Sequence, residues 1–441
     1  MNLRIDTKAD YILSKLKENG FESFIVGGCV RDLILGKTPK DYDITTNAKP
    51  EKIIETFKDH KTILTGIKYG TVTVLIDKIP FEITTYRKEQ EYINNRKPKG
   101  VIFLSSIEKD LYRRDFTINS MAYNNEKKLI DLYGGVDDIQ KGIIRAIGNK
   151  NEKFEEDAIR ILRAYRFAGR YDWKIEKETK NAMIKNMHLL NNIAKERIIP
   201  ELKEIFESGM DINKMEFITT LFPVINDCFN TYQNNKYHMK SVGEHIYNTF
   251  NNIDNVFHLK MTMLLHDIGK VYTKTTDQNN VDHFYNHADI SREKSKIILN
   301  EFKFDNDTKH KILTLIENHD KYMAPEPKYI KKMLNKIGED LFFDLIKVRI
   351  ADDSAKNQEL VKNNIKIFNE TLTLTKKIIK EKQPYSIKDL DISGKDLMEL
   401  GYEGKEIGEI LNFMLDKVIE NESLNNKNTL IKLINNKKNY T

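Results

Sequence analysis

The sequence of 441 residues contains only two cysteines, Cys29 and Cys228, so neither a disulfide framework nor a zinc knuckle can be built from it. It also lacks any run of about eighteen uncharged apolar residues, the length that a membrane-spanning helix requires. The opening segment is charged and amphipathic and has no apolar signal-peptide core. We therefore expect a soluble protein in the reducing cytoplasm.

Internal repeats and low-complexity tails are also missing. The net charge of +6 is mildly basic, which is compatible with a nucleic-acid partner but does not require one. Hydrophobic residues make up 40% of the chain and charged residues 31%, as is ordinary for a globular protein. Composition thus defines a globular class and leaves the function open.

The two ends of the chain differ in their pattern. Short β-rich runs (FIVGG, DYDITT, GTVTVLI, FEITTY) alternate with turn residues before residue 150, and long helical periods with few glycines or prolines follow. Prolines near 223, 325–327 and 384 indicate breaks in the helical part. We expect an α+β fold, with a small mixed-sheet head over 1–150 and mostly α-helical segments over 151–230, 231–365 and 366–441.

Residues 24–46, FIVGGCVRDLILGKTPKDYDITT, carry the most chemical information. A strand runs into Gly27 and Gly28, and a helix is expected to start near Val30. Glycines at such a turn let backbone N–H groups approach a phosphate, with which Arg31 can also pair. Taken alone, this segment is equally compatible with an ordinary tight turn.

Two carboxylates follow in DYDIT. Asp41 and Asp43 stand at i and i+2 in a β-like run and are expected to leave the same face of the strand. They repel each other unless a cation lies between them, as in two-metal nucleotidyl transfer. Glu82 on a neighbouring run is the nearest third carboxylate. A solvated turn pair is the alternative for the two aspartates, and a purely structural role is equally open for Glu82.

The GG-x-V-R-D and D-x-D motifs, followed by YRRDFTINSMAY, DLYGG and EEDAIRILRAYRF, resemble the head of the class II tRNA nucleotidyltransferases and bacterial poly(A) polymerases of the polymerase β-like superfamily. The resemblance implies template-independent addition of CCA to the 3′ end of tRNA from CTP and ATP. It also implies Mg²⁺ at Asp41 and Asp43, with Glu82 as the third catalytic residue. The implied nucleotide-binding residues are Gly27, Gly28, Arg31, Asp32, Arg114, Asp115, Asn119, Glu156, Asp157, Arg160 and Arg163.

Within this set, the resemblance assigns base selection to the group E-D-x-x-R. Asp157 and Arg160 are i and i+3 on an expected helix and should be neighbours on one face. C and A both present an amine beside an acceptor ring nitrogen, so a carboxylate can accept from the amine while a guanidinium donates to the ring. U and G present the reverse order. An ordinary surface ion pair is the alternative, and helix capping is the alternative for Asp115 and Asn119.

Residues 86–100 resemble the flexible loop that lies between these motifs and is lacking in relatives that add only CC. The DLYGG segment resembles the hinge that lets the head change shape when it switches from adding C to adding A.

Histidines and aspartates recur in the helical part, in EHIY, LLHDIGK, YNHADIS, ENHDKY and RIADDSA. Imidazoles and carboxylates together suit one or two divalent metals. This order resembles the HD phosphohydrolase superfamily, which implies a second metal site and an accessory phosphohydrolase activity. An HD fold kept only as body structure is the alternative, and Asp353 competes with Asp352. The implied ligands are His245, His266, Asp267, His287, His319 and Asp352.

The C-terminal segment from about residue 388 resembles the tail of bacterial CCA-adding enzymes. A loop over 401–408 is expected to enter a helix near Lys405, where it can hold a tRNA phosphate or simply close the core. Two functional alternatives share the head motifs, namely an A-only adding enzyme and a poly(A) polymerase. A third alternative is an RNA-binding HD phosphohydrolase with an inactive head.

Overall fold

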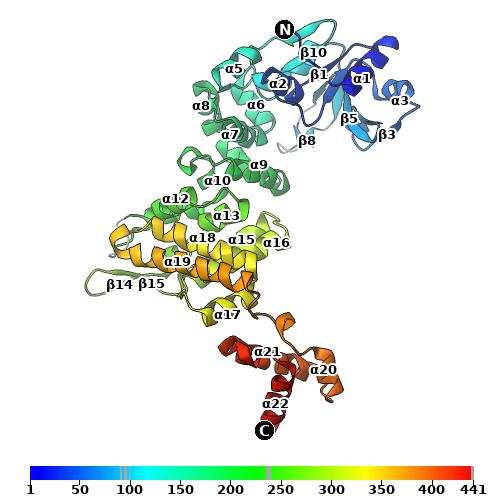
Figure 1. Ribbon diagram of the computed structural model, residues 1–441. Helices are drawn as coiled ribbons and strands as arrows, with labels where there is room; N and C mark the ends of the chain where they lie inside the picture. Colours follow the sequence, from blue (N-terminus) through cyan, green and yellow to red (C-terminus); the bar gives the residue numbers. More distant parts are fainter. Residues whose placement is uncertain (90–91, 94–96, 99, 235–239, 439–441) are drawn as a thin grey trace. The chain divides into compact units, whose positions relative to one another are not determined.

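The computed structural model describes residues 1–89, 92–93, 97–98, 100–234 and 240–438, and the chain divides into two compact units (Figure 1). Unit 1 is Met1–Phe222 and unit 2 is Pro223–Thr441. The expected α+β class is confirmed, because a mixed sheet occupies the N-terminal part and helices dominate the rest. The break expected at Pro223 coincides with the boundary between the units.

A seven-stranded mixed sheet forms the head, in the order β11-β10-β1-β2-β5-β4-β3. Strands β2 and β5 run parallel, and the other neighbours are antiparallel. All four strands expected from the sequence are present. The bounds are β1 Ser23–Val26, β2 Asp43–Thr46, β3 Lys61–Ile63, β4 Thr71–Ile76, β5 Ile79–Thr85, β10 Met121–Asn124 and β11 Lys128–Asp131.

The sheet has an apolar layer beneath it because its strands are rich in apolar residues, either throughout most of their length or at alternate positions. Every residue of β1 is buried, and the even-numbered residues of β4 are buried while the others are partly exposed. The helix predicted over residues 8–19 is α1 (Thr7–Glu18), which buries Ala9, Ile12 and Leu16. The remaining helices of the head are α2 Gly28–Ile34, α3 Pro50–Thr56, α4 Ile107–Tyr112 and α5 Gly135–Lys141.

The register of the sheet brings the sequence-distant carboxylates together. In the parallel pair β2–β5, Asp43 is the Cα partner of Glu82. The loop predicted over residues 86–100 lies partly outside the described residues. Its described parts include β6 Arg87–Glu89, β7 Tyr92–Ile93 and β8 Lys97–Pro98, and β9 Val101–Phe103 pairs with β6.

Helices complete unit 1. The longest are α7 (Ile159–Tyr171) and α9 (Lys195–Glu207), which pack against each other. The segment expected over 1–150 and most of the one expected over 151–230 therefore lie within one compact unit, while residues 223–230 belong to unit 2. The other elements are α6 Lys150–Glu156, α8 Lys177–Asn186, α10 Ile218–Leu221, and the short pair β12 Ile143–Ile144 and β13 Lys174–Ile175.

Unit 2 is almost entirely helical, with one hairpin made of β14 (Lys274–Thr276) and β15 (Asp282–Phe284). The boundary expected at residues 365–366 falls inside α19 (Gln358–Lys380). The other helices are α11 Val224–Asn230, α12 Val242–Asn252, α13 Phe257–Leu265, α14 Lys270–Thr273, α15 His287–Glu301, α16 Asn306–Asn318, α17 Pro327–Ile337, α18 Glu339–Ser354, α20 Gly394–Glu399, α21 Lys405–Glu420 and α22 Lys427–Lys438.

The tail has a hydrophobic cluster of its own, built around Leu397, Met414 and Leu430. As expected, a loop enters α21 at Lys405, after Gly404 with φ +58°. Across the part of the chain that is described, none of the helices combines the length and the apolar character needed to cross a bilayer.

Candidate functional site

A pocket of about 730 Å³ opens in unit 1 where the edge of the sheet meets α7 and α9. Its lining is unusually rich in arginine, so the pocket is suited to a polyanionic ligand. The lining residues are Gly27, Gly28, Arg31, Asp41, Asp43, Arg113, Arg114, Asp115, Asn119, Asp157, Ile159, Arg160, Arg163, Arg166, Phe167, Arg170, Arg197, Pro200 and Glu201.

Asp41 and Asp43 both line this pocket, but they do not share a strand as the D-x-D spacing predicts, because β2 begins at Asp43 and Asp41 lies in the bend before it. Partial burial raises the pKa of Asp43; Arg114 opposes the shift, and the carboxylates of Asp41 and Glu82 add to it. Three like charges in one place are costly unless a cation joins them. The donor set is all oxygen, which is the set that Mg²⁺ prefers.

The glycine turn brings the backbone close to these carboxylates. Gly27 has φ +80°, a conformation that residues with side chains rarely adopt. A Cβ atom placed on it would lie 3.0 Å from Nη1 of Arg114 and 3.9 Å from Oδ2 of Asp43. Helix α2 begins at Gly28, two residues before the expected start at Val30. Glycine is therefore required here for the turn, whereas the flexible Arg114 side chain could move aside for a Cβ atom.

A chain of hydrogen bonds holds the triphosphate-binding candidate Arg31. Its Nη1 donates to Oδ1 of Asn119 at 2.6 Å, and the Asn119 amide donates to Asp115 at 3.1 Å. The other oxygen of Asp115 accepts from Arg163 Nε at 2.7 Å. Asp115 is 7% exposed, yet Arg163 and the amide of Asn119 outweigh its burial and lower its pKa to about 2. The ionised carboxylate thus ties two arginines of the pocket together.

Two of the expected nucleotide-binding residues support other side chains. Asp32 accepts from Arg31 Nε at 3.0 Å and from the Tyr171 hydroxyl at 3.3 Å. Glu156 accepts from Arg160 Nη1 at 2.8 Å. Neither carboxylate belongs to the pocket lining. The structure therefore places both behind arginines that do line the pocket.

The prediction that Asp157 and Arg160 share one helix is wrong. Asp157 ends α6 in an extended conformation (φ −150°, ψ 99°), whereas Arg160 lies in the first turn of α7. At this break the Asp157 carboxylate accepts from the Ile159 N–H at 3.4 Å, and the N-cap position of α7 is Ala158, which has no capping side chain. Both side chains nevertheless reach the same pocket.

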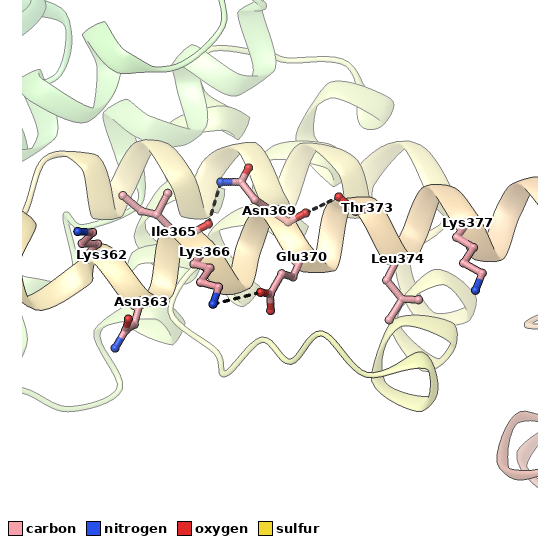
Figure 2. Close-up of a pocket in the computed structure, with 9 residues that line it drawn as sticks. All are labelled: Lys362, Asn363, Ile365, Lys366, Asn369, Glu370, Thr373, Leu374 and Lys377. Atoms are coloured by element: carbon pink, nitrogen blue, oxygen red, sulfur yellow. Dashed lines mark hydrogen bonds and ion pairs between the residues drawn. The ribbon is translucent and has the colours of Figure 1, made fainter.

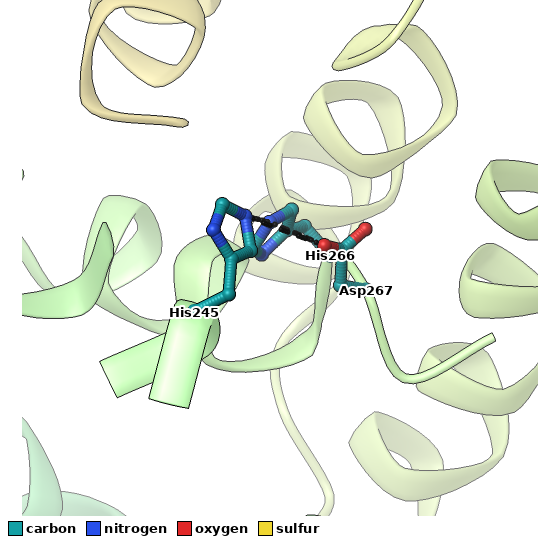
Figure 3. A group of neighbouring side chains, drawn as sticks. All are labelled: His245, His266 and Asp267. Atoms are coloured by element: carbon teal, nitrogen blue, oxygen red, sulfur yellow. Dashed lines mark hydrogen bonds and ion pairs between the residues drawn. The ribbon is translucent and has the colours of Figure 1, made fainter. Parts of the chain in front are cut away.

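A second group of side chains gathers in unit 2. Nε2 of His245 lies 2.8 Å from Oδ1 of Asp352 and 3.4 Å from Oδ2 of Asp267. Nε2 of His266 lies 3.4 Å from that of His245 and 3.3 Å from Oδ2 of Asp267. Figure 3 shows three of these side chains pointing toward one another. Two imidazole nitrogens and two carboxylate oxygens at these separations form a suitable set for one divalent cation.

Asp267 also takes part in an adjoining group through its other oxygen. Oδ1 lies 3.3 Å from Nε2 of His287 and 3.5 Å from Nε2 of His319, and these two nitrogens are 3.3 Å apart. All six residues implied by the HD resemblance are therefore brought together. Asp353 lies outside both groups and instead pairs with Lys356 and Asn364.

Charge in this cluster is arranged around ionised carboxylates. Burial disfavours the charged form of Asp267, but His266 and Lys270 lower its pKa well below the usual range. Lys356 does the same for Asp352. Burial lowers the pKa of His245 to about 4, whereas the carboxylates of Asp267 and Asp352 outweigh burial at His266 and raise its pKa to about 9. The cluster opens to a pocket of about 560 Å³ that includes Lys270, Lys356 and Arg349.

Gly269 in the HDIGK segment explains how His287 comes so close. A Cβ atom on Gly269 would lie 2.2 Å from the His287 carbonyl oxygen and 2.6 Å from the Ser291 nitrogen. The Gly269 N–H instead donates to the Ser291 hydroxyl at 2.8 Å. Only glycine allows the start of α15 to pack against the segment that carries His266 and Asp267.

An open groove of about 710 Å³ follows one face of α19 (Figure 2). Three lysines, Lys362, Lys366 and Lys377, are spread along it, and Glu370 lies 3.8 Å from the ammonium group of Lys366. The face carries net positive charge and is open to solvent.

Comparison with known proteins agrees with these arrangements. A model described as poly A polymerase head domain matches residues 23–145, and one described as tRNA nucleotidyltransferase domain 2 matches 272–434. The CCA-adding enzyme of Ligilactobacillus salivarius is 36% identical over 440 residues, which is 96% of this chain and 95% of that protein. The chain belongs to the CCA-adding enzyme family. It is a nucleotidyltransferase.

Solved structures show the same fold. The Bacillus stearothermophilus CCA-adding enzyme in complex with CTP aligns with a TM-score of 0.69 at 23% identity, covering 98% of each chain. The Thermotoga maritima CCA-adding enzyme complexed with tRNA aligns with a TM-score of 0.60, also at 23% identity, over 99% of this chain and 100% of that one.

Several pocket residues of the nucleotidyltransferase were not foreseen from the sequence. Arg166 and Arg170 follow the predicted Arg163 at i+3 and i+7 along α7, a spacing that could have revealed a common face. Arg197 had no such signal, because it reaches Asp157 from 40 positions further along the chain. In unit 2, the pocket lysines Lys270 and Lys356 were likewise missed.

Proposed function

We propose that the chain adds C, C and A in order to the 3′ end of tRNA, using CTP and ATP without a nucleic-acid template. The observation that carries the proposal is that one pocket of unit 1 joins the paired carboxylates to an arginine-rich lining and to Asp157 and Arg160. Membership of the CCA-adding enzyme family supports it.

Asp41 and Asp43 would hold Mg²⁺, with Glu82 as the third carboxylate. The all-oxygen donor set and the raised pKa of Asp43 fit this ion, because a bound cation relieves the repulsion among the three groups. When bound, Mg²⁺ activates the attacking 3′-hydroxyl and stabilises the charge of the phosphoryl group in transfer.

The triphosphate would lie along the glycine turn. Gly28 begins α2 there, where the first backbone N–H groups of a helix have no partner within it, and the side chains of Arg31 and Arg114 contribute positive charge. Asn119 and Asp115 hold Arg31 through the hydrogen-bond chain described above, so its guanidinium is already oriented before a nucleotide enters. Arg163 is fixed by the same carboxylate.

Base selection would rest on Asp157 and Arg160. The carboxylate accepts from the exocyclic amine of C or A, and the guanidinium donates to the neighbouring ring nitrogen. Arg160 is 8% exposed, and its Nη1 donates to the Lys153 carbonyl at 2.9 Å while Nη2 donates to the Arg113 carbonyl at 3.1 Å. A guanidinium fixed in this way presents one orientation to the base.

The test uses three tRNA transcripts that end before CCA, after C and after CC, each incubated with each NTP and Mg²⁺. Ordered addition of C, C and A followed by arrest is the expected result. Addition of A to the CC-ended transcript alone would instead identify an A-only adding enzyme. A long A tail on arbitrary RNA would identify a poly(A) polymerase, and no incorporation would favour a phosphohydrolase with an inactive head.

A second activity is favoured by the two ligand groups of unit 2. We propose that this HD-type cluster holds two divalent cations that share Asp267, whose two oxygens face separate histidine sets. Lys270 and Lys356 line the adjoining pocket and would bind the phosphate of a phosphomonoester or a 2′,3′-cyclic phosphate. Bound cations would supply a metal-activated water for phosphate-ester hydrolysis.

Metal analysis tests this second proposal independently of nucleotide addition. The full chain is loaded with Mn²⁺, desalted and assayed for bound metal, and hydrolysis of 2′,3′-cyclic AMP is measured in parallel. We expect His266→Ala to lose bound metal and hydrolysis. His258→Ala is the matched control, because His258 pairs with Asp344 away from the cluster. Equal metal content in wild type and His266→Ala would disprove the site.

RNA would be held mainly through its backbone. The lysines along α19 and the entry to α21 at Lys405 provide positive charge without a base-reading pattern. A model for an RNA-binding site of polymerase A matches residues 172–210, which supports an RNA contact in unit 1 as well. We therefore propose tRNA as the partner of both units.

A further inference from the structure

The two side chains proposed to read the base are held by different partners. Asp157 and Arg160 form no direct ion pair in the part of the chain that is described. Arg160 is fixed by Glu156 and two backbone carbonyls. The carboxylate of Asp157 has one backbone contact, from the Ile159 N–H at 3.4 Å, and one charged partner.

That charged partner is Arg197. Its Nη2 donates to Oδ2 of Asp157 at 2.7 Å, within the range of a charge-assisted hydrogen bond. Arg197 lies in the first turn of α9, and both residues line the nucleotide pocket. The contact therefore forms at the pocket wall and connects α9 to the break between α6 and α7.

The exposure of the Arg197–Asp157 pair indicates whether the pair stabilises the fold or mainly orients the Asp157 carboxylate. The side chain of Arg197 is 35% exposed and that of Asp157 is 14% exposed, so solvent screens the pair and its contribution to folding is small. Its effect on geometry is larger. Asp157 has an extended backbone at a helix break, and Arg197 is the side chain that hydrogen-bonds its Oδ2, while Arg163 attracts the carboxylate only through charge.

We infer that Arg197 is a positioning residue for nucleotide specificity, which orients the Asp157 carboxylate toward the exocyclic amine of incoming C or A. This inference rests on the proposed reading of the base by Asp157 and Arg160. One carboxylate oxygen remains bound to Arg197, and the lone pairs not used by Arg197 face the amine. Loss of Arg197 leaves Arg160 in place and frees only the carboxylate.

Loss of Arg197 should affect recognition at one position of the incoming base, the position of the exocyclic amine. U presents a carbonyl where C presents an amine, and an oriented carboxylate repels that carbonyl. A carboxylate that rotates away no longer accepts from C and no longer repels U. Selectivity for CTP over UTP therefore falls, mostly through kcat/KM for the correct nucleotide.

The experiment measures kcat/KM for CTP and UTP with the full chain and a tRNA transcript that ends before CCA. For Arg197→Ala we expect the CTP:UTP ratio to fall roughly tenfold or more, the value of one charged hydrogen bond. Arg197→Lys should recover part of the ratio because it retains the charge. Lys203→Ala is the matched control, since Lys203 is an exposed cation on the same helix.

Asp157→Ala gives the loss of selectivity expected when the carboxylate is absent, and it tests base reading by Asp157 separately from positioning by Arg197. If Asp157→Ala keeps the ratio, the proposed base reading is wrong. If Asp157→Ala collapses the ratio but Arg197→Ala keeps it, the role of Arg197 is disproved. An equal loss for CTP and UTP in Arg197→Ala would also overturn it, because Arg197 would then grip nucleotide or RNA without selecting. The double variant should lose no more selectivity than Asp157→Ala alone.

Discussion

At the scale of single residues, Asp115 has an unusual position, because it is buried yet ionised. Arg163 and the Asn119 amide supply the compensation, and through Asn119 the same carboxylate orients Arg31. Capping alone does not account for these contacts, although Asp115 also accepts from the Phe116 N–H at 2.8 Å. Asp115 thus links the stability of unit 1 to the geometry of the pocket.

This coupling predicts a pH-dependent stability effect. The pKa of Asp115 falls from 3.8 to about 2 on folding. A depressed pKa stabilises the folded state above the unfolded value, and this stability is lost as pH falls through the folded value. The shift corresponds to about 2 kcal/mol. Asp115→Asn should therefore lower the melting temperature at pH 7.

The measurement is the melting-temperature difference between wild type and Asp115→Asn from pH 3 to pH 7. We expect the full difference above about pH 5 and a smaller one toward pH 3, because the Asp115 carboxyl of the unfolded chain takes up a proton there while that of the folded chain is still ionised. Lys52→Ala serves as a control, since Lys52 forms an exposed pair with Glu55 that contributes little. A difference that does not change with pH would contradict the coupling.

At the scale of elements, close approach of backbones depends on particular glycines. Gly134 and Gly135 precede or begin α5 in the DLYGG segment, but their surroundings differ. A Cβ atom on Gly135 would lie 2.4 Å from the Thr117 carbonyl oxygen, whereas one on Gly134 would meet nothing within 4 Å. Gly134 is required only for its φ of +74°.

These neighbours provide a matched comparison. Gly135→Ala should destabilise unit 1 by about 3 kcal/mol or more, because α5 must move away from the Thr117 backbone. Gly134→Ala should cost about 1 kcal/mol, the strain of a positive φ. Denaturant unfolding of the two variants checks the order. Equal losses would show that the packing between α5 and the Thr117 segment is adaptable.

Gly269 has the corresponding role in unit 2, where it allows α15 to approach the HDIGK segment. Gly269→Ala should displace His287 from Asp267 and weaken Mn²⁺ binding roughly ten- to a hundredfold, as losses around metal ligands do. Gly338→Ala is the control, since Gly338 also lies in unit 2 and a Cβ there would meet nothing within 4 Å. Equal metal affinity in the two variants would contradict the role of Gly269.

At the scale of the whole molecule, the two candidate sites belong to separate compact units. The head carboxylates belong to unit 1 and the histidine cluster to unit 2, so their chemistries should be separable. Asp43→Ala should reduce nucleotide incorporation by roughly a thousandfold or more while leaving hydrolysis of 2′,3′-cyclic AMP intact. His266→Ala should have the opposite effect.

Both activities are measured on both variants, at equal protein concentration and with the same Mg²⁺ and Mn²⁺ levels. Asp289→Ala is a control for unit 2, because Asp289 is exposed on α15 outside the ligand groups. Loss of both activities from either variant would refute two independent sites.

Short motifs in the sequence were enough to predict the strands of the head and many residues of the two candidate sites. Alternation and turn residues identified the strands of the head, and the D-x-D spacing correctly placed Asp41 and Asp43 in one pocket. The histidine and aspartate motifs identified all six members of the unit 2 cluster. These patterns depend on residues near one another in the chain, where backbone geometry alone fixes the direction of a side chain.

Only the tertiary structure decided the contacts that span long separations. The register of β2 with β5 set Glu82 beside Asp43, and the packing of α7 against α9 brought Arg197 to Asp157. Helical periodicity predicted Asp157 and Arg160 on one face, but the helix breaks at Asp157, whose backbone is extended. The sequence by itself determined which chemical groups are present, while packing decided which of them meet, because contact partners across the fold have no spacing rule.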